Sequence, residues 1–183
     1  MIGYNNNTNA NTNNSFNNMT TTQAQNCYGK YRGKVIENDD PDHKGRIQAS
    51  VPDIYDSFVT GWALPCTPYG GNNVGFFFIP PKEANVWIEF ENGNPDYPIW
   101  VGCFWGNDEL ESDKAVPDTK MIKTEFATMT IKDDFGTGEV KIETTNGLKF
   151  VMDNSGIELS NGTFNIKMTA LSVSINDGAL VVK

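Results

Sequence analysis

Two patterns of apolar and polar positions follow one another along the chain. From Cys27 to about Trp105, short apolar runs are interrupted by glycine, proline and asparagine, whereas from Met121 onward apolar and polar residues alternate one by one. A period of two residues places every second side chain on the same face of a β-strand. The pattern therefore predicts an all-β chain with two β regions of different kinds.

The first region has strand-like runs at 28–37, 46–51, 61–64, 74–79, 86–90 and 99–104. Short strands separated by turn residues are typical of a small barrel or sandwich. Five principal strands within residues 27–106 fit a Greek-key OB barrel. The run 74–79 is almost wholly apolar, so we expect a strand that is covered on both faces.

A turn rich in Gly, Asn, Pro and Asp lies between the last two of these runs. The sequence from Glu89 to Gly102 is EFENGNPDYPIWVG. Glycine supplies positive φ, proline fixes φ, and Asn and Asp side chains bond to the nearby backbone. This segment predicts a long hairpin that closes the barrel.

The second region repeats its apolar pattern about every 8–10 residues, which is regular enough for a degenerate repeat. Turn signals such as Asn146-Gly147, Asn161-Gly162 and Asp177-Gly178 separate the runs. One-sided strands cannot bury their apolar face alone and need stacked neighbours. Three chains wound about an axis would turn the apolar positions inward and leave Lys141, Glu143, Glu158 and Lys167 outside; the alternative is a monomeric sandwich. The predicted trimer core is Val140, Ile142, Leu148, Phe150, Met152, Ile157, Leu159, Phe164, Ile166, Met168, Val173 and Ile175.

Charge narrows the choice of function. The chain has 23 acidic and 14 basic residues and a formal net charge of −9, and the excess is spread over both regions. Nucleic-acid binders gain much of their affinity by neutralising phosphates with Lys and Arg, so this balance argues against them. No apolar run approaches the roughly 20 residues of a membrane span, and the N-terminus does not resemble a signal peptide. We expect synthesis in a reducing cytosol.

Two segments fall outside the β regions. Residues 1–26 are dominated by Asn and Thr, which predicts a disordered or docking arm. Residues 107–120 are acidic with few apolar side chains and are interpreted as a linker. The predicted domains are therefore the arm 1–26, the OB domain 27–106, the linker 107–120 and a second β domain at 121–183.

The candidate chemistry is sparse, and we predict no catalytic, cofactor-binding or metal-binding residues. Three cysteines are too few for a disulfide framework or a zinc site, and Cys103 is expected to be buried and reduced. His43 lies in a polar turn with no second ligand, so a solvated turn residue outweighs a metal ligand. Three acids in that turn (Asp39, Asp40 and Asp42) lack the spacing of a calcium cage.

Two further groups have both a functional and a structural interpretation. Glu89 and Glu91 lie two residues apart and could form a glycosidase pair, but a solvated or subunit-facing edge is favoured. The four tryptophans could stack nucleic-acid bases, but the acidic balance favours packing in a core or an interface: Trp62, Trp87, Trp100 and Trp105.

Several segments together resemble the phage baseplate assembly protein V and VgrG family, which forms central spikes of contractile tails and type VI secretion systems. They are Gly45-Arg46-Ile47, Trp62-Ala63-Leu64-Pro65, Val86-Trp87-Ile88-Glu89-Phe90, the barrel turn with Gly93, Pro95, Asp96, Pro98 and Gly102, and Asn146-Gly147-Leu148-Lys149-Phe150. The resemblance covers most of the chain after residue 28. It implies an OB-fold collar followed by an intertwined triple-stranded β-helix in a homotrimer.

The resemblance also implies a function and partners. It implies a non-enzymatic needle of a virion tail or injection particle that punctures the target envelope and touches its membrane transiently. A baseplate hub or tube protein would bind the OB end. The chain lacks the His-x-His motif of a metal-binding apex, so a separate PAAR-like tip protein would bind the last residues: Ala179, Leu180, Val181, Val182 and Lys183. The alternatives are a single-stranded nucleic-acid-binding OB protein and an enzyme acting on cell-wall glycans.

Overall fold

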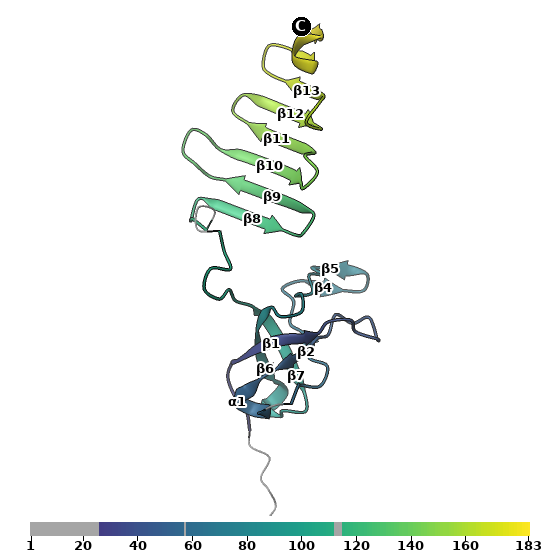
Figure 1. Cartoon of the computed structure of the whole chain (residues 1–183), viewed down its shortest axis with the longest axis vertical. Helices are drawn as coiled ribbons and strands as arrows, with labels where there is room; N and C mark the ends of the chain where they lie inside the picture. Colours follow the sequence, from purple (N-terminus) through teal and green to yellow (C-terminus); the bar gives the residue numbers. More distant parts are fainter. Residues whose placement is uncertain (1–25, 57, 112–114) are drawn as a thin grey trace, which may run out of the picture. The chain divides into compact units, whose positions relative to one another are not determined.

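The computed structural model describes residues 26–56, 58–111 and 115–183. The chain divides into two compact units, with unit 1 ending at Phe104 and unit 2 beginning at Trp105 (Figure 1). The predicted arm at 1–26 lies outside the described residues except for Asn26. Within the described ranges, no helix is long and apolar enough to cross a membrane.

Unit 1 is built on a five-stranded sheet with the strand order β2-β1-β6-β7-β3. Only β3 and β7 pair in parallel; the other neighbours are antiparallel. A bridge between Ile47 and Ala63 joins the two ends of this order, because Ile47 precedes β2 and Ala63 precedes β3. The bridge brings the sheet edges together in the manner of an OB barrel. The strands are β1 (Tyr31–Glu37), β2 (Gln48–Ser50), β3 (Leu64–Pro65), β6 (Asn85–Phe90) and β7 (Pro98–Cys103), with one short helix, α1 (Pro52–Tyr55).

The apolar core of unit 1 is enclosed by the strands of this sheet. Alternate residues of β6 are buried, as the period of two predicts, and these are Val86, Ile88 and Phe90. They pack with apolar side chains from β1, β2, the segment before β3, and β7: Val35, Ile47, Ala49, Val51, Ala63 and Trp100. Unit 1 therefore has a closed apolar core of its own.

The hairpin that joins β6 to β7 has the predicted turn chemistry. A 3-10 turn, η1 (Glu91–Gly93), contains Asn92 and Gly93 at φ values of 53° and 75°. The Cys27 N–H donates to the Gly93 carbonyl at 2.7 Å, and the Tyr55 hydroxyl donates to the carbonyl of Pro95. The turn is thus held against both the start of the described chain and α1.

Two predictions about burial in unit 1 are wrong. Cys103 is exposed, because it is the last residue of β7 and lies at the edge of the core. The run 74–79 is not a covered strand. Within it only β5 (Val74–Gly75) forms a strand, and it pairs with β4 (Gly70–Gly71) in a small separate hairpin (Figure 1).

The phenylalanines after β5 show the second error most clearly. Phe76, Phe77 and Phe78 are 56%, 73% and 58% exposed. An apolar run indicates that a segment will be covered, but it does not say whether the cover comes from the same chain.

Unit 2 is an antiparallel meander in which each strand pairs with the next one along the chain (Figure 1). Its turns contain the predicted residues with positive φ, including Gly147 and Gly162. Within one chain the strands are not interleaved, so the intertwining of three chains stays a prediction. The strands are β8 (Thr119–Lys123), β9 (Ala127–Lys132), β10 (Glu139–Thr144), β11 (Lys149–Asp153), β12 (Gly156–Ser160), β13 (Asn165–Met168), β14 (Val173–Ile175) and β15 (Leu180–Val182), with a 3-10 turn, η2 (Asn176–Gly178).

Candidate functional site

The register of the meander collects its apolar residues into two rows on one face. Directly paired residues on successive strands form each row. The first row is Lys120, Ile131, Val140, Met152, Ile157, Met168, Val173 and Val182, and the second is Ile122, Met129, Ile142, Phe150, Leu159, Ile166, Ile175 and Leu180. Residues two apart on a strand share a face, so both rows lie on the same side, here called the apolar face. Lys120, on the first strand, is the only polar member.

The apolar face has nothing over it within the described chain. Among the described residues of unit 2, Thr130 is the only one that is buried, and all of the apolar side chains are at least partly exposed. Leu159 and Met168 remain 49% and 50% exposed even though each has a partner on a neighbouring strand. An exposed apolar surface of this extent marks an interaction site, because monomeric proteins rarely leave one open.

The opposite face of unit 2 is polar. Lys141 and Glu143 form an ion pair at 2.9 Å there, and Glu158 lies directly across from Lys167. These are the four residues predicted to lie outside, and the register places all of them on this side. The Lys141 and Glu143 side chains are 27% and 35% exposed, so water still reaches the pair and weakens its contribution to stability.

One edge of the apolar face is hollowed. The hollow lies between the turns that lead into β11 and β13, and Leu148 and Phe164 line it together with Leu159, Ile166 and Ile175. Leu148 and Phe164 are two residues before Phe150 and Ile166, so they extend the apolar face by one further position at this edge. Polar residues complete the lining of the hollow: Lys149, Ser160, Asn161, Asn165 and Asn176.

All twelve residues predicted for a trimer core thus lie on one face of the sheet or continue it at its edge. Their role in a trimer stays a prediction. Sequence reasoning left out Ile122, Met129 and Ile131, which extend the same rows to β8 and β9. The alternation of Met129 and Ile131 with threonines was the signal that could have included them.

The residues predicted to bind a tip protein lie at the C-terminal end of the meander. Leu180 and Val182 close the two apolar rows, and Val181 lies on the opposite face. All five residues from Ala179 to Lys183 are exposed. Among the strands that the structure describes, β15 pairs only with β14, which leaves a strand edge open.

The charged loop before β2 is organised around Asp40. The Asp40 carboxylate is buried and accepts hydrogen bonds from the Arg46 guanidinium and from the backbone N–H groups of Asp42, Lys44 and Arg46. The Arg46 guanidinium, followed by the backbone donors, holds the pKa of Asp40 well below its usual range. His43 is an exposed turn residue at φ 55°, as predicted.

The other candidate groups are dispersed. Glu89 pairs with Lys30, and Glu91 begins the 3-10 turn η1, so the two glutamates do not face a common cleft. Trp100 is buried and its indole donates to the Gly45 carbonyl at 3.1 Å, whereas Trp105 is 67% exposed. Among the described residues, no group of His, Cys, Asp and Glu is arranged to hold a metal ion.

Comparison with known families assigns each unit separately. The type VI secretion system/phage-baseplate injector OB domain matches residues 31–105, and the phage baseplate V C-terminal trimerisation domain matches residues 120–181. A search of curated proteins finds no match. The two matched domains agree with the barrel of unit 1 and with the uncovered apolar face of unit 2. The chain therefore belongs to the phage baseplate V family and joins that family's injector OB domain to its trimerisation domain.

Proposed function

We propose that this chain is the homotrimeric central spike of a contractile tail or injection machine, in which three copies of unit 2 form a needle. The single observation that carries the proposal is the pair of apolar rows along the meander, which extend over all eight strands with one polar exception. The match to a trimerisation domain supports other copies of the chain as the cover for this face.

A closed prism of three such sheets suits a mechanical task. The apolar faces would turn inward and form a dry interior, while Lys141, Glu158 and Lys167 would remain in water. Each sheet pairs its strands internally, so among the described strands of unit 2 only β8 and β15 present open edges, one at each end. A structure of this kind unfolds only when all of its walls separate, which gives resistance to force without any catalytic step.

The two ends of the spike would have different partners. We assign the OB unit to a baseplate hub or tube protein, because it matches the injector OB domain. We assign a PAAR-like tip protein to the other end, because β15 offers an apolar strand with an unpaired edge. Strand edges bind other proteins by adding a strand to the sheet. The needle would then cross the target envelope and touch its membrane only in passing.

The tip assignment has a direct test. The full chain is immobilised and a PAAR-like cone protein from the same machine is passed over it. We expect retention, and we expect its loss when residues 176–183 are deleted. The matched control is Lys183→Ala, which leaves β15 intact and should retain the cone. Equal retention by the deleted and intact chains would contradict the assignment.

A further inference from the structure

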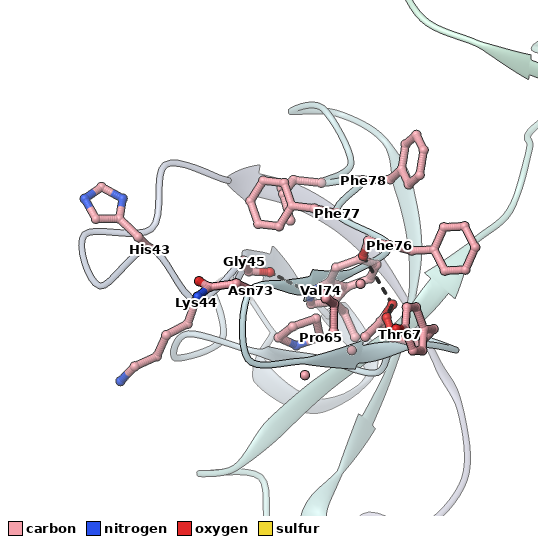
Figure 2. A pocket seen from close by; sticks show the side chains of 16 residues that line it. His43, Lys44, Gly45, Pro65, Thr67, Asn73, Val74, Phe76, Phe77 and Phe78 are labelled. Atoms are coloured by element: carbon pink, nitrogen blue, oxygen red, sulfur yellow. Dashed lines mark hydrogen bonds between the residues drawn. The ribbon is translucent and has the colours of Figure 1, made fainter.

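Unit 1 carries an exposed aromatic surface that its barrel does not use. The surface consists of Tyr69, Val74, Phe76, Phe77 and Phe78 on and after the β4–β5 hairpin, and we call it the aromatic hairpin. Each of these side chains is more than half exposed. Figure 2 shows the three phenylalanine rings projecting from the segment that follows β5. Isolated exposed apolar residues are ordinary, but five within ten positions form a patch.

The aromatic hairpin has a defined shape. The Phe76 N–H donates to the Tyr69 carbonyl at 3.0 Å, and the Thr67 hydroxyl donates to the Phe76 carbonyl at 3.3 Å. The ring of Phe76 lies 6.4 Å from the rings of both Tyr69 and Phe78. Gly75 has φ 152°, and a Cβ there would lie 2.8 Å from the Tyr69 carbonyl oxygen, so only glycine allows this close turn.

The aromatic hairpin and the loop at 43–45 together line a groove of about 540 Å³ (Figure 2). Pro65, Ile79 and Trp100 contribute apolar surface to it. The hydrogen bond from the Trp100 indole to the Gly45 carbonyl fixes one wall to the barrel. The patch is therefore a preformed surface with a recess, which is the usual form of a binding site.

Charge indicates what could approach this surface. There is no charged residue between Asp56 and Lys82, and no carboxylate is among the described residues that line the groove. The rest of the chain is acidic, with a net charge of −9. Two acidic copies repel each other over most of their surfaces, so an uncharged patch is where they can come into contact at the lowest electrostatic cost.

We propose that in the trimer the aromatic hairpin of each unit 1 is covered by unit 1 of a neighbouring copy. This inference rests on the trimer proposed above. Only 15 residues, 104–118, separate β7 from β8. Trimerisation of unit 2 therefore holds three copies of unit 1 at an effective concentration on the order of millimolar. A patch that meets a different surface on the next copy gives a head-to-tail contact that closes after three repeats.

The test compares two phenylalanines of equal exposure. Phe77 in the aromatic hairpin is 73% exposed and Phe58, outside it, is 74% exposed. In a lone chain, replacing either by serine should change stability little. If a neighbouring copy covers Phe77, Phe77→Ser lowers the unfolding temperature of unit 1 by about 5 °C in the trimer. Phe58→Ser should leave it nearly unchanged.

A second background separates contact between copies from packing within one copy. Met152→Asp places a charge on the apolar face of unit 2 and is expected to dissociate the trimer. In that background, Phe77→Ser should no longer lower the unfolding temperature of unit 1. A loss that persists in the dissociated chain would show that Phe77 packs within its own unit, and it would overturn the inference.

Hydrogen exchange and mass complete the test. In the purified wild-type chain, amides of residues 67–79 should be protected, and the protection should disappear in the Met152→Asp variant. If the chain is a trimer by light scattering but these amides exchange freely and the two serine variants behave alike, the inference fails and the trimer stands. Free exchange in the purified trimer is the outcome expected if a different protein, absent from the sample, covers the aromatic hairpin. If the wild-type chain is a monomer, both fail.

Discussion

Phe150 on β11 and Leu159 on β12 lie directly opposite each other, and neither side chain is buried. A cross-strand apolar pair contributes to the stability of a sheet, but its outer surface still faces water unless a second layer covers it. The same arrangement recurs from β9 to β15. The strands of unit 2 thus pair with their neighbours along the chain while its apolar face stays unpacked, which is the structural basis for assembly with other copies.

A charge placed on the apolar face should separate the copies. Met152 lies on this face and its neighbour Val151 lies on the polar face, paired with Lys141 and Glu158. Met152→Asp would bury a carboxylate in each of three chains, at a cost of several kcal/mol each. Light scattering should show the dissociated chain. Val151→Asp puts the same charge one residue away and should keep the mass of the assembly. Dissociation by both variants, or by neither, would refute the assignment of the two faces.

Gly156 marks a close approach of two backbones in unit 2. It has φ 142°, and a Cβ there would lie 1.9 Å from the Met168 carbonyl oxygen. Gly156→Ala should therefore push β12 away from β13 and destabilise the assembly by about 1–3 kcal/mol per chain. Thermal unfolding followed by circular dichroism measures this loss. Gly138, where the nearest atom would be 3.5 Å away, is the control, and Gly138→Ala should melt as the wild type does.

The Asp40 cluster should make unit 1 sensitive to acid. The folded-state pKa of Asp40 is held low by Arg46, and the hydrogen bond from Lys82 lowers the pKa of Glu37 to about 2. A depressed pKa means that the unfolded chain binds more protons than the folded chain below about pH 4. The stability from these carboxylates is therefore complete above about pH 5 and declines as the pH falls toward 2. Urea unfolding of unit 1 at several pH values should show this decline.

The variant Asp40→Asn gives the matching control. It should be less stable than the wild type at pH 7, because the asparagine removes the buried one of the two carboxylates that pair with the Arg46 guanidinium and leaves only the more exposed Asp42. It should also lose less stability between pH 5 and pH 2. Parallel pH profiles for the variant and the wild type would show that Asp40 does not contribute to the acid sensitivity.

The OB unit is not expected to bind nucleic acid. Its aromatic hairpin could stack bases, but binding of single strands also requires a positively charged groove along the backbone. Lys44 is the only Lys or Arg among the described residues that line its groove, and the chain as a whole carries a net charge of −9. Fluorescence anisotropy with a labelled single-stranded oligonucleotide at low salt should show no binding at micromolar protein. Saturable binding that weakens as salt is added would favour the nucleic-acid-binding alternative.

Periodicity in the sequence was sufficient to assign the faces of unit 2. Strand geometry forces Ile157 and Leu159 to one side and Glu158 to the other, whatever the surroundings. The turn of Asn92 and Gly93 was predictable for a similar reason, since few residue types adopt positive φ. These features depend on neighbours in sequence, and the structure confirms them.

Features that depend on contacts between residues far apart in the sequence were harder to predict. The exposed positions of Phe76 to Phe78 were mistaken for a covered strand, because an apolar run carries no information about which chain covers it. Cys103 was placed inside because it continues an apolar strand, but β7 ends there. The hydrogen bonds between Asp40 and Arg46 depend on the conformation of the whole loop, and no local sequence pattern predicts them.

The mass of the purified full chain in solution tests the central claim most directly. Light scattering coupled to size exclusion measures it without reference to shape. We expect three times the chain mass of 20.3 kDa, unchanged on dilution through the micromolar range. A single species with the mass of one chain would contradict it, because the apolar face of unit 2 would then have no other copy to cover it.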